Sequence, residues 1–397
     1  MHIVYVCREY PPSLRGGGIA SYIKEIAHGM HRRGHQVTVI AASDDTRKES
    51  EEMDDGVRVL RLKGGDFVIP SVENSTNKLL KLRELYRFRS YRKRIRRVIQ
   101  SLEAVDIIEV PEFGAEGLYL SGLAIPMVVR LHTPSLFDRD TQEINTLSLH
   151  NAFRYWQQWK EFEIVKESKY ITCCSDSLRQ WFYNNVANIK AEIEVIYNPV
   201  DLNQEIVSAA NKGNPFILFA GTIVDVKGVE DLIKASIIMH NQGDCHELII
   251  AGKEGEFADY LKKSYSEYGW IRFSGKLPKG ELYALYRQAD VVCLPSWWDN
   301  LPMACLEAMM NRAVVVAGSE GGMSEIIENG VNGFLVEPKN PELLSIRIAE
   351  VLSLEGKERI RDAAYSRIKN AFASDVVVSA MEDYYKKVIM DFKRNTK

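Results

Sequence analysis

Pro295–Met309, P-S-W-W-D-N-L-P-M-A-C-L-E-A-M, joins an apolar strand predicted over Asp290–Leu294 to a helix predicted over residues 302–310. Proline at the first helical position leaves no backbone N–H unsatisfied and presets φ, so it marks the junction. The stretch carries two carboxylates, Asp299 and Glu307, which are eight residues apart. Eight residues of helix make a little over two turns, so we expect Glu307 to continue the face of Asp299.

The start of this predicted helix also suits an anion. Backbone N–H groups there have no partner within the helix, and the helix dipole adds partial positive charge. A phosphate would bind these amides, and the two carboxylates would bind the hydroxyls of an attached sugar. The alternative is an ordinary strand and helix with two exposed acids. The backbone N–H groups that would bind the phosphate are those of Asn300, Leu301, Met303 and Ala304.

The composition predicts a globular protein with two domains. Its 397 residues exceed the roughly 250 to 300 at which a single core stops growing. The net charge of −3 gives no global attraction to nucleic acid. Six cysteines without a C-x-x-C pair indicate buried thiols in a reducing compartment, with no disulfide frame or zinc site. We expect no signal peptide and no membrane span, and therefore a cytoplasmic protein.

Two successive series of alternating strands and helices predict two doubly wound sheets with a cleft between them. We expect an N-terminal domain over residues 1–198, a second over 199–374, and a last helix over 375–397. Short apolar runs are typical of strands buried on both faces of a parallel sheet. In the first half these are Ile3–Cys7, Gln36–Ala42, Val57–Leu62, Asp106–Val110, Met127–Leu131, Tyr170–Cys174 and Glu194–Tyr197. In the second half they are Phe216–Gly221, Glu247–Gly252, Ile271–Gly275, Asp290–Leu294, Ala313–Gly318 and Phe334–Val336.

Polar and glycine-rich segments follow several of these strands, at the edge where open α/β sheets bind ligands. Gly17 and Gly18 precede a predicted helix, where glycine lets backbone approach a ligand closely; the alternative is a flexible surface turn. His132 ends another strand, where a structural histidine is the alternative. Glu112 and Glu116 face the same edge and are candidate ligand contacts.

A long helix predicted over residues 77–102 is strongly basic. Its apolar residues interleave with the bases, which predicts docking on anionic lipid, at about 1 kcal/mol per basic residue near the surface. The alternative is a solvated helix face. Against a single acid, Glu84, the segment carries Lys78, Lys81, Arg83, Arg87, Arg89, Arg92, Lys93, Arg94, Arg96 and Arg97.

The spacing D-x7-E, preceded by P-S and followed by E-A-M, resembles the E-x7-E signature of retaining GT-B glycosyltransferases of family 4, with Asp299 in place of the first Glu. The resemblance extends over almost the whole chain. It implies two Rossmann-like domains, an N-terminal one for the acceptor and a C-terminal one for a nucleotide-sugar donor, with the last helix crossing back onto the N-terminal domain. Glu112 and Glu116 are then candidate contacts for the acceptor. Neither a metal nor another cofactor is implied.

The resemblance also implies roles for particular residues. The loop Gly221–Gly228 is similar to the family loop in which an Arg and a Lys hold the diphosphate. Lys227 matches the Lys, but Thr222 occupies the position where the family has the Arg. Arg8, Arg15 or Arg130 are candidates to replace that charge. His132 resembles the family's histidine beside the donor sugar, and Glu307 would bind the ribose. The remaining donor contacts would be Gly17, Gly18, Gly221, Gly275, Leu277, Asn300, Leu301, Pro302 and Met303.

These features predict a retaining transfer of a sugar from a nucleotide-diphosphate sugar, UDP ahead of GDP or ADP. The expected acceptor is a glycan, a lipid-linked sugar or another hydroxyl, in the synthesis of cell-surface polysaccharide or glycoconjugate. Two alternatives remain. A GT-B nucleotide-sugar epimerase would need no acceptor, and a catalytically impaired subunit would bind the nucleotide sugar for a partner transferase.

Overall fold

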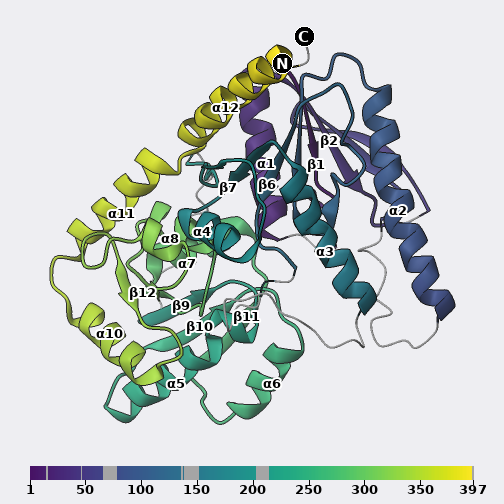
Figure 1. Ribbon diagram of the computed structural model, residues 1–397. Helices are drawn as coiled ribbons and strands as arrows, with labels where there is room; N and C mark the ends of the chain where they lie inside the picture. The colour runs from purple at the N-terminus through teal and green to yellow at the C-terminus, as the bar shows by residue number, and fades with distance from the viewer. Residues whose placement is uncertain are drawn as a thin grey trace. The chain divides into compact units, whose positions relative to one another are not determined.

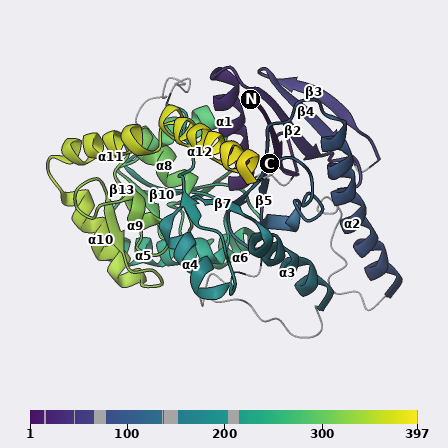
Figure 2. The same cartoon turned by 45° about the horizontal axis from the view of Figure 1, so that its top comes forward.

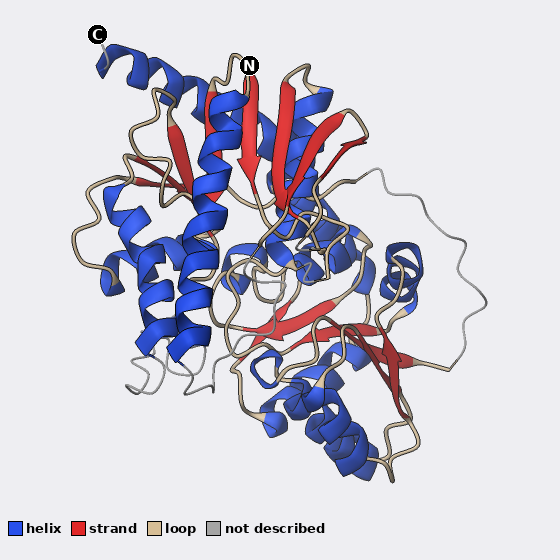
Figure 3. Cartoon of the chain, turned by 90° about the vertical axis from the view of Figure 1, so that its right-hand side faces the viewer, coloured by secondary structure: helices blue, strands red, loops and turns tan. Residues whose placement is uncertain are grey.

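The computed structural model describes residues 1–14, 17–45, 47–65, 78–135, 137, 152–202 and 214–395, except the side chains of 78–81 and 152–155. The chain divides into two compact units. Unit 1 combines the N-terminal half, through Pro199, with Ser374–Lys397, and unit 2 comprises Val200–Ala373. In each unit the strands form one sheet with helices beside it (Figure 3).

The sheet of unit 1 has the order β3-β4-β2-β1-β5-β6-β7-β8. Apart from β3, the strands pair in parallel, as their apolar runs predict. The chain winds outward from β1 in both directions, so the order reverses between β1 and β5. The strands are β1 (His2–Val6), β2 (Gln36–Ala42), β3 (Ser50–Asp54), β4 (Val57–Leu62), β5 (Ile107–Pro111), β6 (Met127–Leu131), β7 (Tyr170–Cys173) and β8 (Ile193–Val195).

Among the described strands, the edge strand β3 is the one that the sequence did not predict. It pairs antiparallel with β4, Glu52 opposite Val59 (Figure 2). Its sequence, S-E-E-M-D, has no apolar alternation, and most of the strand is exposed. Pairing with β4 therefore decides its conformation, while its acidic side chains keep this edge from pairing with another chain.

Helices α1 (Gly18–Arg32), α2 (Lys78–Ser101), α3 (Ala152–Glu167), α4 (Asp176–Asn185) and α12 (Ser374–Asn395) complete unit 1, with a short helix η1 (Phe113–Ala115) after β5. Ser175 caps α4, because its hydroxyl accepts the N–H of Leu178 at 3.2 Å. No helix among the described residues is long and apolar enough to cross a membrane.

The last helix, α12, packs against α1, which confirms that the end of the chain returns to the N-terminal sheet (Figure 1). A Cβ at Gly29 of α1 would lie 2.4 Å from Cγ2 of Val378, so glycine here allows the two helices their close approach. The Tyr385 hydroxyl of α12 donates to the buried Glu109 carboxylate of β5 at 2.7 Å. The Tyr22 hydroxyl of α1 donates to the other oxygen of Glu109 at 2.9 Å.

Unit 2 contains a six-stranded, fully parallel sheet in the order β11-β10-β9-β12-β13-β14. The strands are β9 (Phe216–Ala220), β10 (Glu247–Ala251), β11 (Ile271–Gly275), β12 (Val291–Leu294), β13 (Val315–Gly318) and β14 (Phe334–Val336). The helices are η3 (Asp225–Lys227), α5 (Val229–Asn241), α6 (Glu256–Ser264), α7 (Lys279–Gln288), α8 (Met303–Met310), α9 (Met323–Ile326), α10 (Pro341–Ser353) and α11 (Lys357–Ala371). The strand order reverses between β9 and β12.

Candidate functional site

The loops that follow β9 and β12 in unit 2 lie against each other. These strands flank the point where the strand order reverses, which is where open α/β sheets bind ligands. The backbone N–H of Trp297 donates to the carbonyl of Val226 at 2.9 Å, and its indole Nε1 donates to Asp231 at 2.8 Å. Gly228 has φ +66°, and a Cβ there would lie 2.2 Å from the Pro295 carbonyl oxygen. The two loops are therefore held together backbone to backbone.

This contact brings together Lys227 and Asp299, whose side chains form an ion pair in which the ammonium donates to Oδ2. The Lys227 side chain is 20% exposed and that of Asp299 is 14% exposed, so both charges reach solvent at the site. The Asp299 backbone is fixed from a third loop, because its carbonyl accepts the N–H of Gly322 at 2.8 Å. A Cβ at Gly321, which has φ +74°, would lie 2.2 Å from the same carbonyl oxygen.

Glu307 lies on α8 and has different partners. Its Oε1 is 3.6 Å from the Lys279 ammonium and 3.5 Å from the Tyr283 hydroxyl, both on α7. Burial raises the pKa of the Glu307 carboxyl above its ordinary value, although nearby Lys279 opposes that shift. Glu307 is therefore a half-buried acid held by one cation, placed to accept hydroxyl groups.

The expectation that Asp299 and Glu307 share one helical face is wrong. Helix α8 begins at Met303, and Asp299 precedes it in an extended bridge to Gly321. Pro302 also lies just before the helix, with φ −71° and ψ 116°, instead of at its first position. The three-loop packing, not helical periodicity, sets the direction of the Asp299 carboxylate.

The start of α8 nevertheless has the amides that the sequence predicts. The first helical hydrogen bonds are donated by Cys305 and Leu306, both to the Pro302 carbonyl, at 3.0 and 3.3 Å. The N–H groups of Met303 and Ala304 thus have no partner within the helix. Just upstream, the side chains of Asn300 and Leu301 are buried.

The other predicted donor contacts of unit 2 lie at the end of β11 and on the loops after β9 and β11. Thr222 is exposed directly after Gly221, which has φ +153°. Gly275 has φ +65°, and a Cβ added there would meet only Oε1 of Glu254, at 4.0 Å; Leu277 is half-buried. The Gly275 carbonyl accepts the backbone N–H of Gly252 at 2.8 Å, and a backbone contact of this segment to a nucleobase stays a prediction.

In unit 1 the predicted glycines begin α1. Gly17 precedes the helix and Gly18 is its first residue; both are exposed. Neither needs glycine for its own conformation, since Gly17 has φ −149° and a Cβ on either would meet nothing within 4 Å. The chain itself therefore gives no reason for glycine here, and close approach of a ligand stays the prediction. Arg15, a candidate replacement cation, lies outside the described residues.

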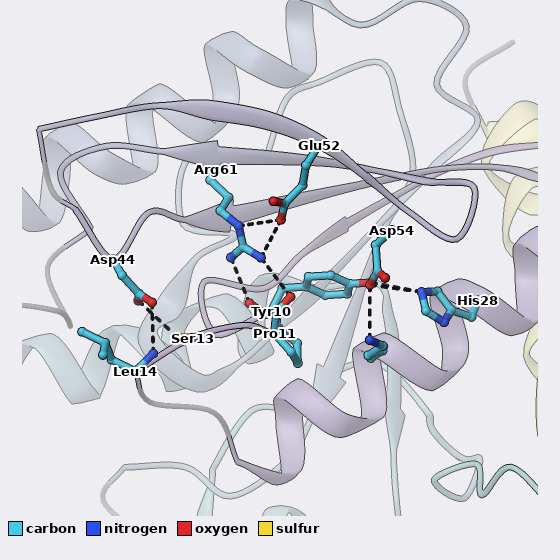
Figure 4. A network of polar contacts seen from close by, with 10 residues as sticks. Tyr10, Pro11, Ser13, Leu14, His28, Asp44, Glu52, Asp54 and Arg61 are labelled. Atoms are coloured by element: carbon cyan, nitrogen blue, oxygen red, sulfur yellow. Dashed lines mark hydrogen bonds and ion pairs between the residues drawn. The ribbon is translucent and has the colours of Figure 1, made fainter. Parts of the chain in front are cut away.

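A polar network fixes the segment that leads to these glycines (Figure 4). Arg61 of β4 donates to the carbonyls of Tyr10 and Pro11 at 3.0 and 2.9 Å. The Tyr10 hydroxyl donates to Asp54 at 2.7 Å, and His28 of α1 lies 3.2 Å from the same carboxylate. The unpredicted strand β3, which carries Asp54, thus helps to position the loop after β1.

The ligand atoms of His28, Asp54 and Asp55 lie within 4.8 Å of one another, which is a spacing that a metal ion could use. The Lys24 ammonium is 3.5 Å from Asp54, however, and already places a positive charge at this carboxylate. We therefore assign the group to the Tyr10 network and not to a metal.

His132 and Glu112 meet in unit 1. The backbone N–H of His132 donates to both oxygens of Glu112 at 2.8 Å. The pKa of Glu112 is raised to about 8, mainly by burial and secondly by the nearby Glu161 carboxylate. Burial and the Arg130 guanidinium lower the pKa of His132 well below its ordinary value, so its imidazole is neutral at pH 7.

The burial of Glu112 and Glu116 does not support direct contact with an acceptor. Both are 0% exposed. Glu112 holds the strand end at His132, and Glu116 Oε2 accepts the backbone N–H of Arg8 at 3.3 Å. These acids position the loops after β1 and β6 from inside the unit.

Arg130 does not supply the charge missing at Thr222. It is 0% exposed, and its guanidinium donates to the carbonyls of Cys173 and Ile196 and to the Asn198 side chain, at 3.1, 2.6 and 3.0 Å. Arg8 is also buried, with its Nε 3.6 Å from Glu116. Both guanidinium groups stabilise unit 1 internally.

Sequence reasoning missed Lys279 and Tyr283, the partners of Glu307, and Trp297, which links the two loops. One signal was available for Lys279. It begins a helix, where a cation is electrostatically unfavourable unless an anion lies beside it. Nothing in the sequence indicates that this anion is Glu307, because the pairing of α7 with α8 is tertiary.

Two family models match the chain and together span most of it. Residues 16–204 match the model described as Glycosyltransferase Family 4. Residues 202–368 match the model described as Glycosyl transferases group 1.

Individual relatives and solved structures match over nearly full length. An uncharacterized glycosyltransferase of Methanocaldococcus jannaschii is 28% identical, covering 97% of this chain and 98% of its own. The glycogen synthase of Mycobacterium tuberculosis is 26% identical over 97% of this chain and 94% of its own length. The structure of sucrose-phosphate synthase from Thermosynechococcus elongatus has a TM-score of 0.81 at 18% identity and matches 98% of this chain and 99% of its own. The structure of Anabaena HepE with UDP-glucose has a TM-score of 0.71 at 18% identity and matches 98% of this chain and 100% of its own. The structural likeness establishes the fold, which is GT-B.

Proposed function

Because this chain belongs to the glycosyl transferases of group 1, with a family 4 N-terminal half, we propose that it transfers a sugar from a nucleotide-diphosphate sugar to a hydroxyl acceptor with retention. The observation that carries the proposal is the Lys227–Asp299 pair, held beside the start of α8 where the strand order of unit 2 reverses. A cation and helix amides suit a diphosphate, and a carboxylate beside them suits sugar hydroxyls.

In the proposed reaction Lys227 and the amides of Met303 and Ala304 bind the leaving diphosphate. The donor phosphate competes with Asp299 for the Lys227 ammonium, which releases the Asp299 carboxylate to bind sugar hydroxyls. Glu307 binds the ribose, and His132 is the proposed sugar contact in unit 1.

The proposed attack is on the front face of the sugar. The acceptor oxygen bonds to the anomeric carbon as the bond to the diphosphate oxygen breaks, and that departing oxygen takes the acceptor's proton. No residue is then required as a covalent nucleophile. Charge that develops on the diphosphate is stabilised by groups already in place.

UDP-sugar is the favoured donor class. HepE, a structural neighbour, was solved with UDP and with UDP-glucose, whereas a starch synthase of Arabidopsis with the same fold was solved with ADP. The favoured acceptor is a glycan or a lipid-linked sugar. The proposed location is the cytoplasm, at the inner face of the membrane.

The first test is a thermal-shift panel of UDP, GDP, ADP and their common sugar conjugates. A nucleotide at 100 times its Kd should stabilise the protein by about 2.7 kcal/mol. Glu307→Ala should abolish the shift, whereas Glu355→Ala, an exposed acid elsewhere in unit 2, should retain it. If none of the nucleotides shifts the melting temperature, the proposed donor site is wrong. Nucleotide release that needs no acceptor and yields an altered sugar would identify an epimerase.

Helix α2 is the proposed membrane contact, but fewer of its bases are available than its sequence implies. Arg92 is 0% exposed and donates to the carbonyls of Gly114 and Phe88, each at 2.9 Å. Arg94 pairs with Glu49 at 2.7 Å, and Arg96 donates to two carbonyls of the loop after β5. Phe88 and Tyr91 are buried as well. The described bases that stay exposed are Arg83, Arg89, Lys93 and Arg97.

These four bases share one side of α2 with two exposed apolar residues, Leu82 at 61% and Tyr86 at 72%. Exchanging all four for Gln should weaken binding to vesicles with anionic lipid by about 4 kcal/mol, roughly a thousandfold. The matched control exchanges four exposed bases of α11 and α12, Arg359, Lys369, Lys387 and Lys393, and should bind nearly as the unaltered protein does. Equal co-sedimentation of both variants would refute the assignment of α2.

A further inference from the structure

Unit 2 contains a polar cavity of about 700 Å³ at the opposite edge of its sheet from Lys227. Its walls come from the end of α7, the end of α8 and the side of α11. Asp290, which lines it, directly precedes β12, and Arg312 lies between α8 and β13. The cavity is thus at the amino ends of strands whose carboxyl ends lead to the proposed donor site.

One of the residues that line this cavity, Asn311, has an unsatisfied polar atom. Asn311 is 2% exposed, and its amide nitrogen donates to the Glu307 carbonyl at 2.8 Å. Its Oδ1 is buried and has no hydrogen-bond partner among the described residues. A buried acceptor without a partner is unfavourable, so a hydroxyl or N–H group of a bound molecule would be stabilised here.

Three arginines line the cavity, each from a different part of unit 2. Arg312 pairs with Asp362, and Arg361 pairs with Glu358 at 2.5 Å; these acids hold the two side chains in place. Arg287, at the end of α7, is exposed and has no acidic partner among the described residues. An uncompensated guanidinium is suited to binding a phosphate or carboxylate with two parallel hydrogen bonds.

Tyrosine rings complete the lining. Tyr283 is buried and Tyr365 is half-buried, and rings of this kind cover the C–H faces of a sugar. The volume is in the range of sites for small molecules and far exceeds what a phosphate ion needs. We propose that this cavity binds an anionic monosaccharide, its phosphate or carboxylate at Arg287 and its hydroxyls at Asn311.

The cavity is connected to the proposed donor site through Glu307. Asn311 binds the Glu307 carbonyl, and the Tyr283 hydroxyl lies 3.5 Å from the Glu307 carboxylate. A ligand that moves either side chain changes the position of Glu307, so its binding and nucleotide binding are coupled by the same factor in both directions. This coupling, unlike binding in the cavity itself, rests on the proposed function.

Calorimetric titration of the full chain with glucose 6-phosphate, glucuronate, glucose and inorganic phosphate tests the proposal. Glucose 6-phosphate or glucuronate should bind once per chain, at least tenfold more tightly than glucose or phosphate. Arg287→Gln should weaken this binding at least tenfold, the size of a lost charge-assisted pair. Arg359→Gln, an exposed arginine of α11 outside the cavity, is the matched control and should bind as the unaltered protein does.

No binding of either anionic sugar, or equal binding by the two arginine variants, overturns the proposal. Binding of phosphate as tight as that of glucose 6-phosphate overturns the carbohydrate assignment. A second titration, with UDP, is made with and without the saturating sugar, and an at least fivefold change in UDP affinity is expected from the coupling. Glu307→Ala should lose UDP binding but keep the sugar, so failure of the donor site is distinguishable from failure of this cavity.

Discussion

Lys227→Ala is expected to slow donor turnover by about 10² to 10³ while leaving the melting temperature little changed. The reason is that the Lys227 ammonium pairs with Asp299 just before the start of α8, where the leaving diphosphate is proposed to bind. The rate to measure is nucleotide release at a saturating concentration of the donor that the nucleotide panel identifies. Unchanged turnover would remove Lys227 from the mechanism.

A double variant separates two explanations of such a loss. Without Lys227, the carboxylate of Asp299, which is only 14% exposed, has lost its counterion and would repel a phosphate. In Lys227→Ala with Asp299→Asn this repulsion is absent. If Lys227 binds the diphosphate, the double variant stays slow. Recovery of the rate would mean that Lys227 serves only to neutralise Asp299.

Gly228→Ala should destabilise the protein by about 3 kcal/mol or more. A residue with a side chain at φ +66° costs about 1 to 2 kcal/mol. In addition, the new Cβ would lie 2.2 Å from the Pro295 carbonyl oxygen, and overpacking of this kind costs about 1 to 3 kcal/mol. Calorimetry should show the melting transition of unit 2 lowered by roughly 6 to 12 °C, since 1 kcal/mol is worth about 2 to 4 °C for a folding unit of about 150 to 250 residues.

The matched control is Gly356→Ala in the same unit. Gly356 has φ +71°, but a Cβ there would meet nothing within 4 Å. Gly356→Ala should therefore lower the free energy of unfolding by the conformational cost alone, about 1 to 2 kcal/mol. Equal losses in the two variants would show that the loops after β9 and β12 do not restrain each other. Nucleotide affinity should fall only in Gly228→Ala, because Lys227 is the preceding residue.

The parallel strands and their connecting helices could be predicted, because short apolar runs between turn residues determine buried strands locally. Thus β9 and β12 appear where Phe216–Gly221 and Asp290–Leu294 predict them, within a residue or two. The return of α12 also followed from the resemblance to a known family. The edge strand β3 could not be predicted, since its polar residues form a strand only through pairing with β4.

The candidate site, too, could be predicted only in part from the sequence. The sequence alone determined which groups the site has: a lysine after one strand, a carboxylate after another, and a helix start with unpaired amides. Only the tertiary structure decided that Lys227 meets Asp299, that Glu307 meets Lys279, and that Arg130 is buried. Chemical type is a property of each residue, whereas the partner of a charge depends on loops that pack together from distant parts of the chain.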